Sequence, residues 1–142
     1  MSTTPSGTEL NRLDVVGRTI VSIVQEVIIN DEKGMDWAYT FYELDSGVVF
    51  CLPFQDAGRL SAENPTEGTE PIELESVLGE QIVDVLRDGP ESETCMDSPY
   101  LVLGNGFLVT DVMGAPHGLG AVGVYVYAPD EIERSKLVEF FT

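Results

Sequence analysis

The pattern of apolar and polar residues along this chain is typical of short β-strands. Several segments alternate with a two-residue period, are rich in β-branched and aromatic residues, and are separated by glycine-containing turns. We predict seven strands, at residues 19–30, 36–44, 48–54, 82–87, 99–104, 106–113 and 120–127. The sequences Asp-Ser-Gly at 45–47 and Gly-Asn-Gly at 104–106 predict two hairpin turns.

The sequence also contains an internal repeat. Residues 13–24 align with residues 75–86 at an offset of 62, and residues 41–50 align with residues 100–109 at an offset of 59. Equivalent pairs include Gly17 with Gly79, Ile20 with Ile82, Val21 with Val83, Leu44 with Leu103, and Gly47 with Gly106. Self-similarity of this kind predicts two copies of one structural unit, each with a turn that ends at a glycine, a strand and a hairpin.

The length of 142 residues and the hydrophobic content of 43% suit a single domain, residues 1–142. Its expected parts are repeat 1 at about 13–54, an exposed connection at 55–71, repeat 2 at about 75–113, and a final strand and helix at 120–141. We expect the helix after Pro129, because apolar residues then recur at near-helical spacing. These residues are Ile132, Leu137, Val138 and Phe141.

The expected fold is therefore mainly β (α+β), with antiparallel strands from two tandem repeats of about 60 residues and a short C-terminal helix. Two packed sheets and one strongly curved sheet both satisfy the pattern. Alternation in strand 36–44 places Trp37, Tyr39 and Phe41 on one face and Ala38, Thr40, Tyr42 and Leu44 on the other. We expect both of these faces to be covered.

The charge of the chain limits the kinds of molecule that it can bind. The net charge is −18, and between residues 60 and 133 a single cation, Arg87, stands against fifteen Asp and Glu residues. Such a field repels nucleic acid and anionic lipid and attracts basic protein surfaces. The N-terminus lacks the features of a signal peptide, and no apolar stretch is long enough to span a bilayer. We therefore expect a cytoplasmic protein that binds neither nucleic acid nor membrane.

The sequence holds no motif that carries catalytic chemistry. His117 is the only histidine, and the glycines around it lack the phosphate-binding patterns GK[ST] and GxGxxG. Cys51 lies in an apolar run and Cys95 in a polar loop, so we expect a buried and an exposed free thiol. The four acids between Asp88 and Asp97 are better explained by a solvated loop than by a calcium site. We expect no catalytic residue, no metal site and no cofactor.

Small size, strong acidity, the pattern h-G-x-x-I-V and the segment WAYTFYELDSG together resemble, in a general way, bacterial immunity proteins that neutralise secreted nuclease toxins. The resemblance implies an acidic module that binds a basic protein. We place the contact on carboxylates of one loop and an outward-facing tyrosine of strand 120–127, since tyrosines beside acids are typical of protein interfaces. These residues are Asp88, Glu91, Glu93, Asp97 and Tyr125.

Other classes of function stay open. A small-ligand-binding or enzymatic domain would need a pocket between the repeats, around His117 and Asp111. A secretion chaperone is also small and acidic, but usually has longer helices than this sequence predicts. A structural domain without another partner is a further alternative, and the sequence leaves open whether strand edges pair in a homodimer.

Overall fold

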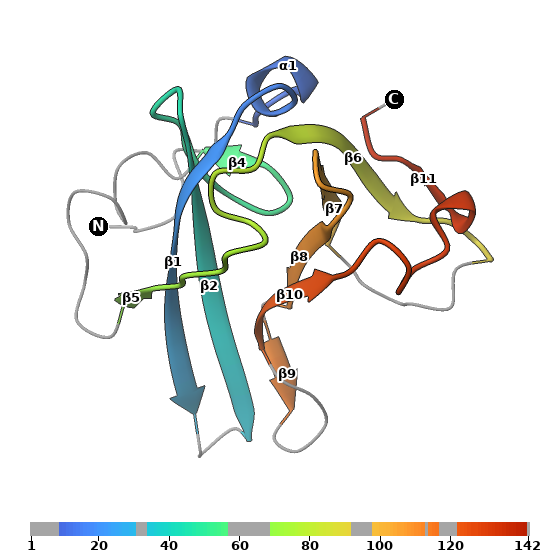
Figure 1. The fold of residues 1–142 in the computed structure, drawn as a ribbon. Coiled ribbons are helices and arrows are strands. Elements are labelled where there is room, and N and C mark those ends of the chain that lie inside the picture. The colour runs from blue at the N-terminus through green and yellow to red at the C-terminus, as the bar shows by residue number, and fades with distance from the viewer. Residues whose placement is uncertain are drawn as a thin grey trace.

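The computed structural model describes residues 9–30, 34–56, 69–91, 98–112, 114–116 and 122–141, which form two antiparallel sheets (Figure 1). The first sheet contains β1 (Ile20–Asn30), β2 (Met35–Leu44), β3 (Val49–Cys51), β4 (Gln55–Asp56), β5 (Thr69–Pro71) and β9 (Gly114–Pro116). The second contains β6 (Ile82–Asp88), β7 (Tyr100–Leu103), β8 (Leu108–Val112), β10 (Gly123–Tyr127) and β11 (Leu137–Glu139).

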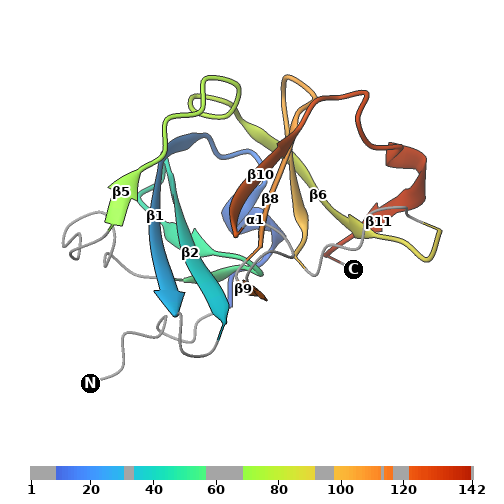
Figure 2. The ribbon, with the colours of Figure 1, turned by 90° about the horizontal axis from the view of Figure 1, so that it is seen from below.

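The strand orders are β4-β3-β2-β1-β5, with β9 also paired to β2, and β10-β8-β7-β6-β11. One short helix, α1 (Arg12–Val15), precedes β1. Seen from below, the two sheets lie next to each other, with β1 and β2 in one and β6, β8 and β10 in the other (Figure 2). The mainly β prediction is confirmed, and the arrangement is that of two packed sheets.

The C-terminal helix is shorter than expected. Arg134–Lys136 form a single 3-10 turn, η1, and residues Leu137–Glu139 form strand β11, which pairs with β6. The Phe140 N–H extends this pairing by donating to the Val85 carbonyl at 3.1 Å. The near-helical spacing of apolar residues was misleading because contact with β6, rather than local propensity, sets the backbone here.

The two ends of the expected connection at 55–71 form short strands. Gln55–Asp56 form β4 against β3, and Thr69–Pro71 form β5 against β1. The remaining residues, 57–68, lie outside the described part of the chain. Both strands are too short to produce a recognisable alternation, so their pairing could not be predicted from sequence.

Reciprocal hydrogen bonds join the two sheets at the start of β1 and β6. The Gly17 N–H donates to the Ile82 carbonyl at 2.7 Å, and the Gly79 N–H donates to the Ile20 carbonyl at 2.8 Å. Between them, Thr19 and Gln81 form an antiparallel bridge. Gly17 and Gly79 have φ values of 93° and 86°, a left-handed conformation that favours glycine. The first strand of each sheet is thereby joined to the other sheet.

The first and second sheets also resemble each other in register, in hairpin turns and in the pairing of an edge strand. The register is interrupted at the same place, with Val21 and Val83 exposed at 47% and 43%. Each hairpin is closed by a 2.9 Å bond from a glycine N–H, Gly47 to Leu44 and Gly106 to Leu103. The edge strands β5 and β11 pair with β1 and β6 at equivalent positions. The two sheets thus share these register interruptions, turn hydrogen bonds and edge-strand pairings.

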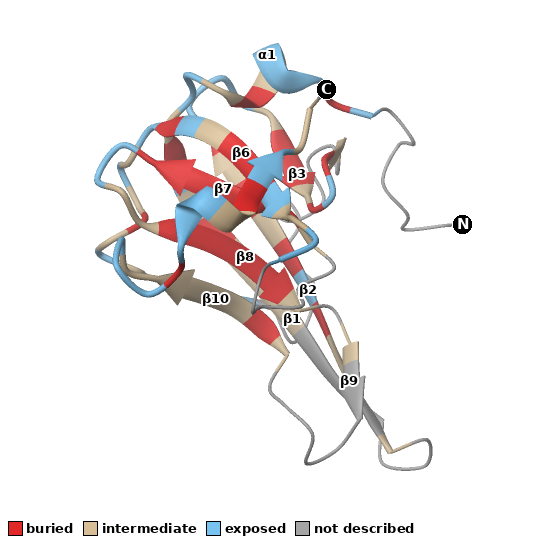
Figure 3. Cartoon of the chain, turned by 90° about the vertical axis from the view of Figure 1, so that its right-hand side faces the viewer, coloured by how far each residue is buried: buried red, intermediate tan, exposed pale blue. Residues whose placement is uncertain are grey.

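The main core lies between the sheets and contains buried residues from both. Its members include Val15, Ile20, Ile23, Tyr42, Phe50, Phe54, Val77, Ile82, Val85, Leu101, Leu103 and Val109. A second apolar cluster covers the other face of the second sheet, so that β7 and most of β8 are buried on both faces (Figure 3). It comprises Leu86, Tyr100, Val102 and Leu108, with Ile132 and Leu137 from the segment after β10.

The first sheet is different, and the expectation that β2 is covered on both faces is wrong. Its inner-face residues, Ala38, Thr40, Tyr42 and Leu44, are buried. On the outer face Tyr39 is 37% exposed, and Trp37 and Phe41 are half-buried. A Cβ added to Gly114 of β9 would lie 2.7 Å from the Trp37 ring, so the indole reduces its exposure by lying across a neighbouring strand.

Candidate protein-binding surface

The outer face of the second sheet carries a row of three tyrosines, Tyr100, Tyr127 and Tyr125, which we call the tyrosine row. Val124 and Val126 pack against the main core, so Tyr125 and Tyr127 point to the opposite face of β10, as alternation predicts. Ring centroids are 6.2 Å apart between Tyr100 and Tyr127 and 6.5 Å apart between Tyr125 and Tyr127. Tyr100 is buried, whereas the two tyrosines of β10 remain half-buried.

Two carboxylates flank the tyrosine row and are held by hydrogen bonds. The Tyr100 hydroxyl donates to Asp88 Oδ1 at 3.0 Å, and the Ala128 N–H donates to Glu131 Oε1 at 2.7 Å. Burial raises the pKa of Tyr127 above its usual 10.0, and Tyr125, Asp88 and Glu131 raise it further. The phenol therefore stays neutral in a locally negative surface.

The structure places two of the five predicted contact residues on this surface. Asp88 is half-buried at the end of β6, and Tyr125 lies in the tyrosine row. Glu91 is exposed three residues beyond Asp88. Glu93 and Asp97 lie outside the described residues. The sheet order β10-β8-β7-β6 brings the tyrosines of β10 and the end of β6 to a common face, with Tyr100 of β7 between them.

Sequence reasoning missed Tyr100 and Glu131 as members of this surface. A signal for Tyr100 existed, because the repeat aligns it with Phe41, an outer-face residue of β2. No comparable signal marks Glu131, since its position depends on a turn in which its own carboxylate binds the Ala128 N–H.

A separate polar group lies between the sheets. Asp111 of β8 is only 6% exposed, and the Tyr42 hydroxyl of β2 donates to its Oδ2 at 2.8 Å. Burial raises the pKa of Asp111 to about 6, although the bond from Tyr42 lowers it. The pKa of Tyr42 lies well above 10.0 because of burial and the Asp111 charge. This pair is a buried link between the two sheets.

Gln25 of β1 makes a second link. Its Oε1 accepts hydrogen bonds from the Val124 N–H at 3.2 Å and from the Thr40 hydroxyl at 3.5 Å. A Cβ on Gly123 would lie 2.8 Å from this oxygen, so glycine allows the close approach. The predicted alternative of a pocket around His117 and Asp111 gains no support, because Asp111 is sealed and His117 lies outside the described residues.

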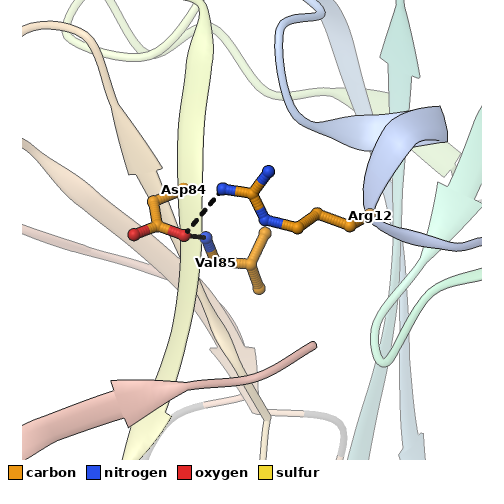
Figure 4. Close-up of polar contacts among 3 residues, drawn as sticks. All are labelled: Arg12, Asp84 and Val85. Carbon is orange, nitrogen blue, oxygen red and sulfur yellow. Dashed lines mark hydrogen bonds and ion pairs between the residues drawn. The ribbon is translucent and has the colours of Figure 1, made fainter. Parts of the chain in front are cut away.

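A third polar contact joins α1 to β6 (Figure 4). Asp84 Oδ1 accepts the Val85 N–H at 2.8 Å and lies 3.5 Å from Arg12 Nη2. A hydrogen bond with Asp84, together with partial burial and the Asp84 charge, raises the pKa of Glu139, while Arg12 lowers it. The exposed Arg12 and Glu139 and the half-buried Asp84 thus connect α1, β6 and β11.

The thiol of Cys51 is less buried than the sequence predicted. Cys51 is free but half-buried rather than buried, and burial followed by the Asp111 charge raises its pKa. Cys95 lies outside the described residues.

Within the described ranges, no group of three or more His, Cys, Asp and Glu residues is arranged to hold a metal ion. Nor does that part of the chain contain a helix long and apolar enough to cross a membrane. Comparisons with protein-family models, curated proteins and solved structures find no match to this chain. Function is therefore inferred from the chain's own residues.

Proposed function

We propose that this chain is a protein-binding module that docks a basic protein through its acidic surface. The observation that carries the proposal is the imbalance of fifteen acids against Arg87 between residues 60 and 133, within a net charge of −18. Many of these acids lie at exposed positions. They include Glu70, Glu73, Glu75, Glu91, Asp130, Glu131 and Glu133.

Such a surface accelerates encounter with a basic partner and repels polyanions. The tyrosine row supplies what charge alone does not, a partly apolar patch that can exclude water at the centre of a contact. A finer form of the proposal is a cytoplasmic bacterial immunity protein against a basic toxin, supported by the general resemblance in size, charge and sequence pattern.

We also propose that residues 13–54 and 75–113 are copies of one unit. The alignment of Gly17 with Gly79 and of Gly47 with Gly106 supports this, as do their matching hydrogen bonds and positive φ angles. Duplication would explain why a chain with two unlike outer faces has one repeated backbone plan.

The test is to identify a basic partner from the native host and to measure its association rate against salt. A variant with Asp88→Asn, Glu91→Gln, Glu93→Gln and Asp97→Asn loses four charges at the proposed contact. A matched control, Glu9→Gln, Glu70→Gln, Glu73→Gln and Glu75→Gln, loses four charges at exposed positions elsewhere.

We expect association to slow with salt for every variant, because screening shortens the field to about 8 Å near physiological ionic strength. The contact variant should bind more weakly than the matched control. An acidic partner, or association that is independent of salt, would contradict the proposed function. Equal binding by the two variants would place the contact elsewhere on the molecule.

A further inference from the structure

The tyrosine row and its flanking carboxylates combine two features that suit one kind of side chain. Tyr125 and Tyr127 present half-buried rings inclined at 37° to each other, with centroids 6.5 Å apart. Asp88 accepts a hydrogen bond from Tyr100, whose ring centroid lies 6.2 Å from that of Tyr127, and Glu131 accepts one from the N–H of Ala128, the residue after Tyr127. Aromatic faces attract cations, and carboxylates accept hydrogen bonds from them.

We infer that the tyrosine row binds arginine side chains of the basic partner, with a guanidinium on the rings of Tyr125 and Tyr127 and its N–H groups directed to Asp88 and Glu131. The inference rests on the proposed function, that the partner is basic. It adds that guanidinium, rather than positive charge in general, is the group recognised.

The chemistry of the two cationic side chains supports arginine over lysine. Guanidinium is planar and weakly hydrated, so it stacks on a ring while its edge still donates to carboxylates. An ammonium is a strongly hydrated point charge, and contact with the rings would remove much of its water. A surface made of carboxylates alone would not distinguish the two, whereas rings next to carboxylates do.

Both carboxylates are already positioned. Asp88 is held by the Tyr100 hydroxyl at 3.0 Å, and Glu131 by the Ala128 N–H at 2.7 Å. Binding therefore orders few side chains, which lowers its entropic cost. Lys136 of η1 forms an ion pair with Glu133, with its Nζ 3.2 Å from Glu133 Oε2. Its charge is therefore balanced within the chain.

The experiment uses the full chain and two defined probes, a nine-residue arginine peptide and a nine-residue lysine peptide. Affinities are measured by calorimetry at low salt, and the contact is located from backbone amide shifts in NMR spectra. We expect the arginine peptide to bind about 3-fold to 10-fold more tightly, with its largest shifts in β10 and at the end of β6.

Variants separate stacking from charge. Tyr125→Leu keeps apolar bulk but removes one of the two rings, and should lower the affinity for the arginine peptide more than the affinity for the lysine peptide. Tyr125→Phe keeps the ring and should retain the preference. Amide spectra of each variant show whether the fold is intact.

The outcomes distinguish the two proposals. Equal affinities for both peptides, or an arginine preference that is undiminished by Tyr125→Leu in a folded protein, would overturn arginine recognition but leave the proposed function standing. Failure of both peptides to bind at low salt would overturn the proposed function and this inference together.

Discussion

The outer faces of the two sheets have similar strands beneath them but different surfaces. On the second sheet, Leu86, Tyr100 and Val102 are buried beneath Ile132 and Leu137. The aligned residues of the first sheet, Val24, Phe41 and Glu43, are half-buried. Glu43 accepts a hydrogen bond from Ser22 at 2.8 Å, where the second sheet has the apolar Val102.

The difference shows that the covering segment, more than the strand itself, decides which outer positions must be apolar. Burying one large aliphatic or aromatic side chain contributes about 1.5–3 kcal/mol. Tyr127 packs against the covered cluster, and Tyr125 and Tyr127 are themselves half-buried.

The largest expected effect tests the contrast in covering directly. Leu108→Ala removes a fully buried side chain from the second sheet's outer cluster and should lower the free energy of unfolding by about 2–5 kcal/mol. Tyr39→Ala on the first sheet should cost less than about 1 kcal/mol, because that side chain is 37% exposed. Urea denaturation measures both, and similar costs would show that the two faces are equally covered.

The next effect concerns the buried Tyr42–Asp111 pair, which is one of the links between the two sheets. The folded pKa of Asp111, about 6, exceeds its usual 3.8, so folding favours the protonated carboxyl. Its stabilising contribution is complete below pH 3.8 and is lost as the pH rises through about 6, in total about 3 kcal/mol.

Asp111→Asn should remove that pH dependence and make the variant more stable than the wild type at pH 7.5. Unfolding free energies at pH 4 and pH 7.5 test this, with exposed Glu75→Gln as the control for overall charge. If the difference in unfolding free energy between the wild type and Asp111→Asn did not change with pH, the raised pKa of the buried Asp111 would be contradicted.

The smallest effect tests the proposed equivalence of the turns at Gly17 and Gly79. Gly17→Ala and Gly79→Ala each place a side chain at a φ near 90°, although neither new Cβ meets another atom within 4 Å. Each should cost about 1–2 kcal/mol through backbone conformation alone, and the two costs should agree closely. Thermal unfolding of both variants tests this; a large disparity would show that the two turns are not equivalent in energy.

Much of the fold was predictable because its signals are local. Alternation located the main strands, and glycine placed the turns at 45–47 and 104–106. Strand β11 and the uncovered face of β2 were not predictable, because each depends on which distant segment lies against it. The same reason limits the site: alternation turned Tyr125 outward, but only the strand order places it on the same face as Asp88.

The reciprocal bonds of Gly17 and Gly79 bear on the proposed duplication of residues 13–54 and 75–113. One unit alone would leave the Gly17 N–H and the Ile20 carbonyl without the partners that the other unit supplies. Under the proposed duplication, the second copy offers the same groups in the opposite direction, which is the defining property of an isologous interface. The junction at Thr19 and Gln81 has the form of a twofold dimer contact built within a single polypeptide.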